Sequence, residues 1–206
     1  MKEMTHDFLY GTDFDFPPRD GPPEKTVALM FIPRSGSNLL ACLMAQTKNL
    51  GFPLEYFSPR NMEMMSERMS DLGAENIEPI LRSRTSPNGV FAFKWNGDFA
   101  GLPYGPALYS ELSPERLIVV DRDDNEAQAR SLAVALKTQE WVVQRGGSRT
   151  DVTPSASEIA TARKALKRHR KDIGRIARKA VPGVLRVTYE QVLADPQGCV
   201  DRFAAF

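Results

Sequence analysis

Four short, mostly apolar runs lie along the chain with longer helical patterns between them, and this arrangement restricts the fold more than any other feature. Each run is bounded by turn residues or by a helix signal. An apolar run without alternation is typical of a strand that is covered on both faces, as in a parallel sheet. The runs cover residues 26–32, 89–93, 117–120 and 184–187.

Helical patterns lie between or after these runs. Apolar and small residues recur at helical spacing over residues 38–48, and longer helices are expected over residues 124–141 and 155–181. The last of these opens with Ser155 and Glu158 at the spacing of a capping box. Strands that alternate with helices predict an α/β fold with three layers, in which a mostly parallel sheet carries helices on both faces.

The composition is that of one soluble globular domain. The 206 residues are 42% hydrophobic, and no stretch approaches the ~20 apolar residues of a membrane-spanning helix. Twenty-seven Lys and Arg against 26 Asp and Glu leave a net charge of +1, so no overall field favours nucleic acid. The two cysteines form neither a disulfide framework nor a metal cluster, and the first residues lack a signal-peptide pattern. We therefore expect a cytoplasmic protein.

The two ends of the chain differ from the middle. Residues 13–24 are rich in proline, glycine and acids, which resist regular structure, so we expect residues 1–24 to form a flexible arm. We expect residues 25–206 to form a single domain. A helical pattern over residues 196–206 reaches the last residue, which is an unusual place for a domain to finish, so we expect the C-terminus to be truncated.

The run at 26–32 leads into a helix through residues 33–38, with the sequence PRSGSN. At a helix N-terminus, free backbone N–H groups and the positive end of the helix dipole point at one place, which suits a phosphate-like anion. Gly36 allows a strained turn, and Arg34 adds a forked cation. The other polar side chains add donors: Ser35, Ser37 and Asn38. A Gly-Ser turn that only caps a helix is the alternative. The nucleoside-triphosphatase motif G-x-x-x-x-G-K-[ST] is absent.

Two further cations stand where strands are expected to end. Lys94 follows the run at 89–93, and Arg122 follows the run at 117–120. In open α/β sheets, ligands bind at the carboxyl edge of the strands, so Arg34, Lys94 and Arg122 converge if their strands are parallel neighbours. Ser131 lies nine positions after Arg122, and helix geometry permits the two to meet without requiring it. Taken alone, Arg122 is a surface arginine and Ser131 a plain helix serine.

Four stretches resemble the trehalose 2-sulfotransferase type of sulfotransferase, which uses 3′-phosphoadenosine 5′-phosphosulfate (PAPS). They keep the family's order and approximate separations over about residues 26–141. The stretches are PRSGSNLL (33–40), GFPLEYF (51–57), PNGVFAFKW (87–95) and RDDNEAQARS (122–131). The resemblance implies a P-loop-like sulfotransferase fold, PAPS as donor without a metal, a small hydroxylated acceptor that is carbohydrate-like or a glycolipid head, and a homodimer.

The resemblance also implies roles for the matching residues. Those that hold the 5′-phosphosulfate are Arg34, Ser35, Gly36, Ser37 and Asn38, and those that hold the 3′-phosphate are Arg122 and Ser131. The family's base is the glutamate of G-x-P-x-E-F-F, which is Glu55 here. Its reach is sufficient, because the helix carries the chain ~16 Å from the loop and the next seven residues span up to ~23 Å back. Glu55 would accept the acceptor's hydroxyl proton, while Arg34 and Lys94 stabilise a loose, in-line transition state.

The chain departs from the family's pattern at two positions, and at position 123 it has Asp in place of the usual Pro. Where trehalose enzymes carry a second glutamate, this chain has Phe52, which predicts an apolar or stacking wall and puts trehalose in doubt. His169 lies on an apolar helix stripe and is expected to pack rather than to catalyse.

Two alternatives to a sulfotransferase stay open. A nucleotide kinase with a degenerate loop would use Asp121 to position Mg²⁺. A catalytically silent anion- or glycan-binding protein would bind nucleotide without turnover.

Overall fold

The structure is a computed structural model, and it describes residues 9–58, 61, 78–98, 105–141, 151–179 and 183–206. In this part of the chain, four strands form one sheet in the order β2-β1-β3-β4, and every pairing is parallel. Each strand overlaps one predicted apolar run, so the predicted parallel sheet is confirmed. The strands are β1 Lys25–Phe31, β2 Val90–Trp95, β3 Arg116–Asp121 and β4 Val184–Thr188.

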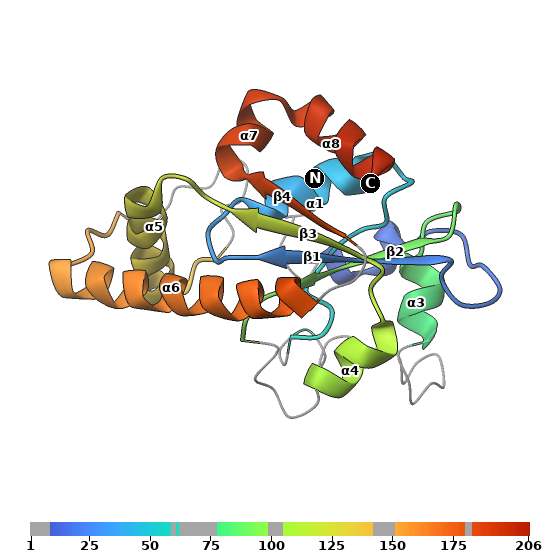
Figure 1. Cartoon of the computed structure of the whole chain (residues 1–206), viewed down its shortest axis with the longest axis horizontal. Coiled ribbons are helices and arrows are strands. Elements are labelled where there is room, and N and C mark those ends of the chain that lie inside the picture. The colour runs from blue at the N-terminus through green and yellow to red at the C-terminus, as the bar shows by residue number, and fades with distance from the viewer. Residues whose placement is uncertain (1–8, 59–60, 62–77, 99–104, 142–150, 180–182) are drawn as a thin grey trace.

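Helices lie on both faces of the sheet, which confirms the three-layer α/β class (Figure 1). One face carries α1 Ser37–Gln46, α7 Tyr189–Ala194 and α8 Pro196–Ala205. The other side carries α3 Glu78–Arg84, α4 Gly105–Leu112, α5 Asn125–Thr138 and α6 Ala156–Lys179. None of the helices described combines the length and the apolar character that crossing a membrane requires.

Alternate residues of the strands enter two separate cores. In β1, Leu29 and Phe31 pack on the α1 and α8 side, whereas Ala28 and Met30 pack on the α5 and α6 side. Burial on both faces is the physical reason why the runs are apolar without alternation. Each large apolar side chain that is buried stabilises the fold by about 1.5–3 kcal/mol relative to exposure.

Side-chain caps fix where α5 and α6 begin. The Asp124 carboxylate accepts a hydrogen bond from the backbone N–H of Ala127 at 2.9 Å, which starts α5. At α6, the Ser155 hydroxyl accepts from the Glu158 N–H at 3.2 Å and the Glu158 carboxylate accepts from the Ser155 N–H at 2.6 Å. The predicted capping box is therefore present. Residues 180–181 of the predicted helix lie outside the described residues.

The N-terminal segment packs against the domain over residues 9–24, which differs from the flexible arm predicted for 1–24. Tyr10 is buried, and the ring of Phe14 lies 5.6 Å from the ring of Phe52. The buried guanidinium of Arg84 donates to the carbonyls of Leu9 and Gly11 at 3.1 and 2.7 Å. Apart from the short 3-10 helix η2 Thr12–Phe14, no named helix or strand lies in this segment, but the aromatic side chains between its prolines and glycines still pack. Residues 1–8 lie outside the described residues.

Candidate active site

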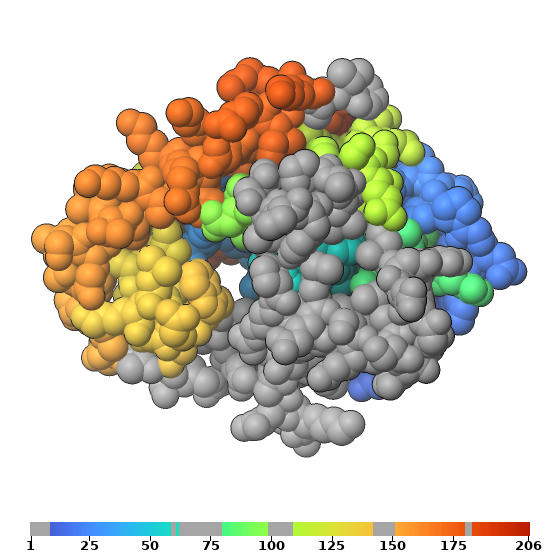
Figure 2. All heavy atoms as spheres, turned by 90° about the horizontal axis from the view of Figure 1, so that it is seen from below, coloured from blue at the N-terminus to red at the C-terminus, as the bar shows by residue number. Residues whose placement is uncertain are grey.

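The carboxyl edge of the sheet brings the three predicted cations together. Arg34 follows β1, Lys94 is the last residue but one of β2, and Arg122 follows β3. All three line one cavity of about 1050 Å³, and Figure 2 shows a hollow in the surface beside α5 and α6. The other predicted site residues that line it are Gly36, Ser37, Asn38, Glu55 and Ser131. The convergence expected from parallel strands is therefore present.

The loop between β1 and α1 is held in the conformation that an anion site needs. Gly36 is the N-cap of α1 with a φ of 76°, in the left-handed region. A Cβ at this position would overlap the ring of Tyr189, so the close approach also requires glycine. Ser35 differs from the prediction, because its side chain is fully buried and does not line the cavity. Its backbone N–H donates a hydrogen bond to the carbonyl of Ile32. The groups that remain toward the cavity come from Arg34, Gly36, Ser37 and Asn38.

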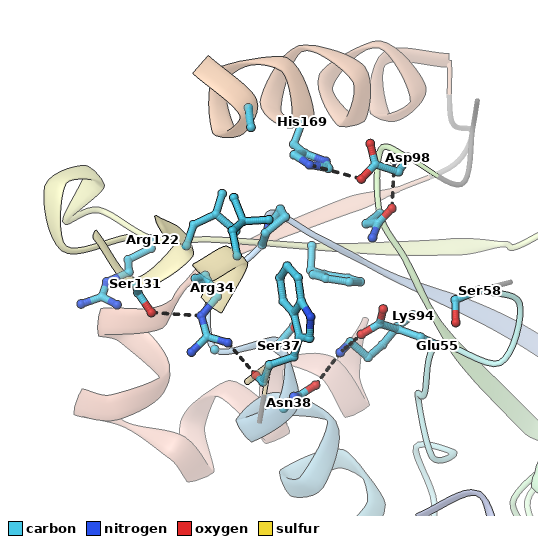
Figure 3. A pocket seen from close by; sticks show the side chains of 18 of the residues that line it. Arg34, Ser37, Asn38, Glu55, Ser58, Lys94, Asp98, Arg122, Ser131 and His169 are labelled. Atoms are coloured by element: carbon cyan, nitrogen blue, oxygen red, sulfur yellow. Dashed lines mark hydrogen bonds and ion pairs between the residues drawn. The ribbon is translucent and has the colours of Figure 1, made fainter. Parts of the chain in front are cut away.

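Arg34 links this loop to α5 (Figure 3). Its Nε donates to the Ser131 hydroxyl at 3.0 Å, and its Nη1 donates to the carbonyl of Trp141 at 2.6 Å. Ser131 was assigned to the 3′-phosphate together with Arg122, and it lines the same cavity, but its hydrogen bond is with Arg34. Ser131 therefore contacts the cation of the predicted 5′-phosphosulfate site.

Arg122 is held by two neighbouring residues to which the family resemblance assigns no role. Its guanidinium lies 4.9 Å from the ring centroid of Tyr189, and its Nε lies 3.7 Å from a carboxylate oxygen of Glu190. That carboxylate also accepts from the backbone N–H groups of Asp123 and Asp124 at 2.9 and 3.3 Å. Desolvation opposes ionisation of Glu190, but these N–H donors and Arg122 lower its pKa overall. The carboxylate therefore remains available to orient Arg122.

The sequence Thr188-Tyr189-Glu190-Gln191 contains a helix-start signal that could have placed Tyr189 and Glu190. The spacing of Thr188 and Gln191 is that of a capping box, and the structure contains both of its hydrogen bonds. The box starts α7 at the carboxyl end of β4, so it places the two residues of the first turn at the same edge of the sheet as Arg122.

Glu55 and Lys94 form an ion pair in the cavity (Figure 3). The Lys94 ammonium donates to Glu55 at 2.8 Å and to the Asn38 side chain at 2.5 Å, and it lies 4.4 Å from the Phe31 ring centroid. Lys94 is 2% exposed, whereas the Glu55 side chain is 27% exposed. The segment before Glu55 runs beside β2, because the Leu54 carbonyl accepts from the Lys94 N–H at 2.8 Å. The chain therefore does return to the loop, as the reach estimate predicted.

His169 is buried on α6, as its place on the apolar stripe predicted, and it also borders the cavity. Its Nε2 lies 3.5 Å from an oxygen of Asp98. Burial lowers the pKa of His169 and Arg168 adds to this, while Asp98 and Asp172 oppose it.

Phe52 does not form the acceptor wall that was predicted for it. It is 4% exposed, packs against Phe14, has the Arg84 guanidinium 5.8 Å from its ring centroid, and is not among the described residues that line the cavity. The N-terminal segment covers it, which the sequence pattern alone did not reveal. Phe52 therefore provides no stacking surface in the cavity, and the second glutamate of the trehalose enzymes is absent at this position.

Asp121 does not fit the Mg²⁺ role of the kinase alternative. Arg170 donates to both of its carboxylate oxygens, at 2.7 and 2.9 Å, and one of these also accepts from the backbone N–H of Arg122. The Arg170 guanidinium reaches Gln128 as well, whose side-chain amide donates to the carbonyl of Pro33 at 2.8 Å. Asp121 thus ties α6 to the sheet. Within the ranges that the structure describes, no three His, Cys, Asp or Glu side chains group as metal ligands would.

Comparison with known proteins gives a likeness at the level of the fold. No family model and no curated protein matches the chain. Among solved structures, the sulfotransferase domain from the Synechococcus PCC 7002 olefin synthase is similar, with a TM-score of 0.52 and 14% sequence identity. The match covers 92% of this chain and 75% of that one. The protein therefore has an α/β fold like that of a sulfotransferase domain, with its cavity at the carboxyl edge of the parallel sheet.

Proposed function

We propose that the protein is a PAPS-dependent sulfotransferase that moves a sulfuryl group to a hydroxyl of a small carbohydrate-like or glycolipid acceptor. The observation that carries the proposal is the joint lining of one cavity by Arg34, Arg122 and the Glu55–Lys94 pair. Ligand cavities usually have volumes of about 300–1,000 Å³. At about 1050 Å³, this cavity has room for a nucleotide donor and a small acceptor together.

The donor is assigned by charge and by backbone geometry. The 5′-phosphosulfate would lie at the N-terminus of α1, where free N–H groups, the helix dipole and Arg34 favour an anion. The 3′-phosphate would bind Arg122, which Tyr189 and Glu190 already hold in place. Ser131 would contribute through its hydrogen bond to Arg34 as well as by facing the cavity.

The transfer step uses Glu55 and Lys94. The acceptor oxygen forms a bond to sulfur while the bond from sulfur to the bridging phosphate oxygen breaks, and 3′-phosphoadenosine 5′-phosphate (PAP) leaves. Glu55 takes the hydroxyl proton, and a base so placed contributes roughly 10²- to 10⁴-fold in rate. Once Glu55 is protonated, the Lys94 ammonium 2.8 Å away loses its ionic partner and stabilises the negative charge of the transferring group together with Arg34.

Calorimetry with PAP tests the donor assignment. PAP should bind equally well with and without EDTA, and Arg122→Ala should weaken binding by about 10- to 100-fold, which is the loss of one charge-assisted contact. Arg163→Ala is the matched control, because Arg163 pairs with Glu126 on the surface and does not line the cavity. Absence of binding heat at millimolar PAP would overturn the proposal.

Turnover separates an enzyme from a silent binding protein. With radiolabelled PAPS and a set of sugar and glycolipid acceptors, the wild type should release PAP in step with labelled product. Glu55→Gln should keep its PAP affinity and lose at least about 10²-fold of the rate. If PAP binds tightly and no acceptor yields product with the wild type, the silent anion-binding function is the better account.

A further inference from the structure

Exposed large hydrophobic side chains are concentrated in the cavity. The described residues include four such side chains, with exposed fractions of 38% for Leu39, 45% for Leu136, 42% for Trp141 and 55% for Leu193. The first three line the cavity, and Leu193 on α7 does not. Single exposed hydrophobic residues are ordinary, but a group of them within one cavity is typical of a ligand site. Leu39, Leu136 and Trp141 are called the apolar wall below.

The apolar wall lines the cavity that also holds the groups of the proposed reaction, although it comes from separate parts of the chain. Leu39 follows Asn38, which accepts the hydrogen bond from Lys94 at 2.5 Å. Trp141 provides the carbonyl that Arg34 contacts at 2.6 Å. Leu136 lies one turn of α5 after Leu132, which also lines the cavity. The wall therefore lines the same cavity as the reacting groups.

Two features favour the acceptor over the donor as the molecule that covers the wall. Lys94 and Glu55, where the acceptor hydroxyl must lie, are joined through Asn38 to the start of the wall. The Arg122 side of the loop has an aromatic ring of its own, because Tyr189 packs against both Gly36 and Arg122. The apolar area of the wall thus stands where the body of an acceptor would continue from its reacting hydroxyl.

We propose that the acceptor is amphipathic, with an alkyl or aryl group close to the hydroxyl that receives the sulfuryl group, and that this group packs on Leu39, Leu136 and Trp141. The inference deepens the proposed function and rests on it. It specifies the acceptor beyond a small carbohydrate, because a plain sugar would leave the wall in contact with water.

A chain-length series tests the proposal. Methyl, butyl, hexyl and octyl β-D-glucopyranosides are titrated into the PAP-loaded protein below their micelle concentrations, with calorimetric detection. Affinity should rise about two- to fourfold for each methylene that the wall covers. Leu136→Ser and Leu39→Ser should flatten this dependence on chain length. Leu193→Ser, the same change at the exposed leucine outside the cavity, should leave it unaltered.

PAP affinity measured in the same variants separates this proposal from the donor assignment. It should be unchanged in Leu136→Ser and Leu39→Ser. An affinity that is independent of chain length in the wild type, or equally steep in all three variants, overturns the apolar wall. A loss of PAP affinity in the wall variants overturns it too, because the wall would then serve the adenine. If PAP itself fails to bind, the donor assignment fails, and the glycoside series without PAP still tests the wall.

Discussion

Arg34 and Ser131 are 97 positions apart in the chain, and a 3.0 Å hydrogen bond from Nε to Oγ joins them across the cavity edge. Arg34 has a left-handed backbone with a φ of 65°, so its side chain leaves the loop in a direction that an ordinary turn would not give. The Trp141 carbonyl accepts a second bond from the same guanidinium. The residues of α5 and just after it therefore orient the cation that the proposed mechanism places on the transferring group.

Replacement of Ser131 by alanine should weaken PAP binding by about 10- to 100-fold, since a hydrogen bond to a charged group contributes about 1.5–3 kcal/mol. Calorimetry measures this directly. Thr138→Ala on the same helix is the control, because its hydroxyl donates to the Val134 carbonyl at 3.0 Å and serves only nearby backbone. Equal PAP affinity in Ser131→Ala and the wild type would show that Arg34 needs no such support.

The sheet and the positions of its cations were predictable from the sequence, and the contacts between distant side chains were not. Runs buried on both faces mark the strands, and once strands are parallel their ends share one edge, which places Arg34, Lys94 and Arg122 together. The bond from Arg34 to Ser131 depends instead on where α5 lies over the loop. Helix periodicity fixes which residues share a face, but not which neighbour that face meets.

Phe52 and the N-terminal segment are a second case in which the sequence did not predict which distant side chains pack together. From the sequence alone, an aromatic residue near a predicted base can be either part of a ligand-binding wall or part of the core. Phe52 belongs to the core because Phe14 packs against it. Phe14 lies in a segment of prolines and glycines whose sequence has no periodic pattern, so this contact was not predicted. In contrast, the exposure of Leu39, Leu136 and Trp141 could only come from the structure, because the first and second belong to helices that also carry buried apolar residues at helical spacing.

The Glu55–Lys94 pair should contribute asymmetrically to stability. Glu55→Ala removes the carboxylate partner of a nearly buried ammonium, which keeps the Asn38 side chain and the Phe31 ring, and should lower the free energy of unfolding by about 1–3 kcal/mol. Lys94→Met should cost less, since methionine fills similar volume and the Glu55 carboxylate, 27% exposed, still reaches water. Urea unfolding measures both values.

The double variant Glu55→Ala/Lys94→Met distinguishes an unpaired charge from lost packing. It should be more stable than Glu55→Ala alone, because removing both members of a pair leaves no buried charge without a partner. Destabilisations that simply add would contradict this account of the pair.

Gly36→Ala should destabilise the protein more than Gly21→Ala, although both glycines have a similar left-handed φ, 76° and 79°. Gly21 has nothing within 4 Å of an added Cβ, so its substitution measures the backbone cost alone, about 1–2 kcal/mol. At Gly36 the same methyl group also meets the ring of Tyr189. In a Tyr189→Ala background, the difference between the two substitutions should shrink. Urea unfolding of the four single and double variants gives the comparison, and equal losses at the two glycines would rule out the contact with Tyr189.

His169 should make the protein less stable as the pH falls below about 6.5. Burial lowers the pKa of His169 from 6.5, so the unfolded chain binds the proton first on acidification. The stability that neutral His169 provides is therefore complete above this pH and is lost as the pH falls toward the folded-state pKa. The lowered pKa values of Glu158 and Glu190 affect the pH dependence of stability only below the ordinary carboxyl pKa of 4.5. Urea midpoints measured between about pH 5 and 7 should thus decline more steeply in the wild type than in His169→Gln. Parallel declines would show that protons bind His169 equally in the folded and unfolded chains.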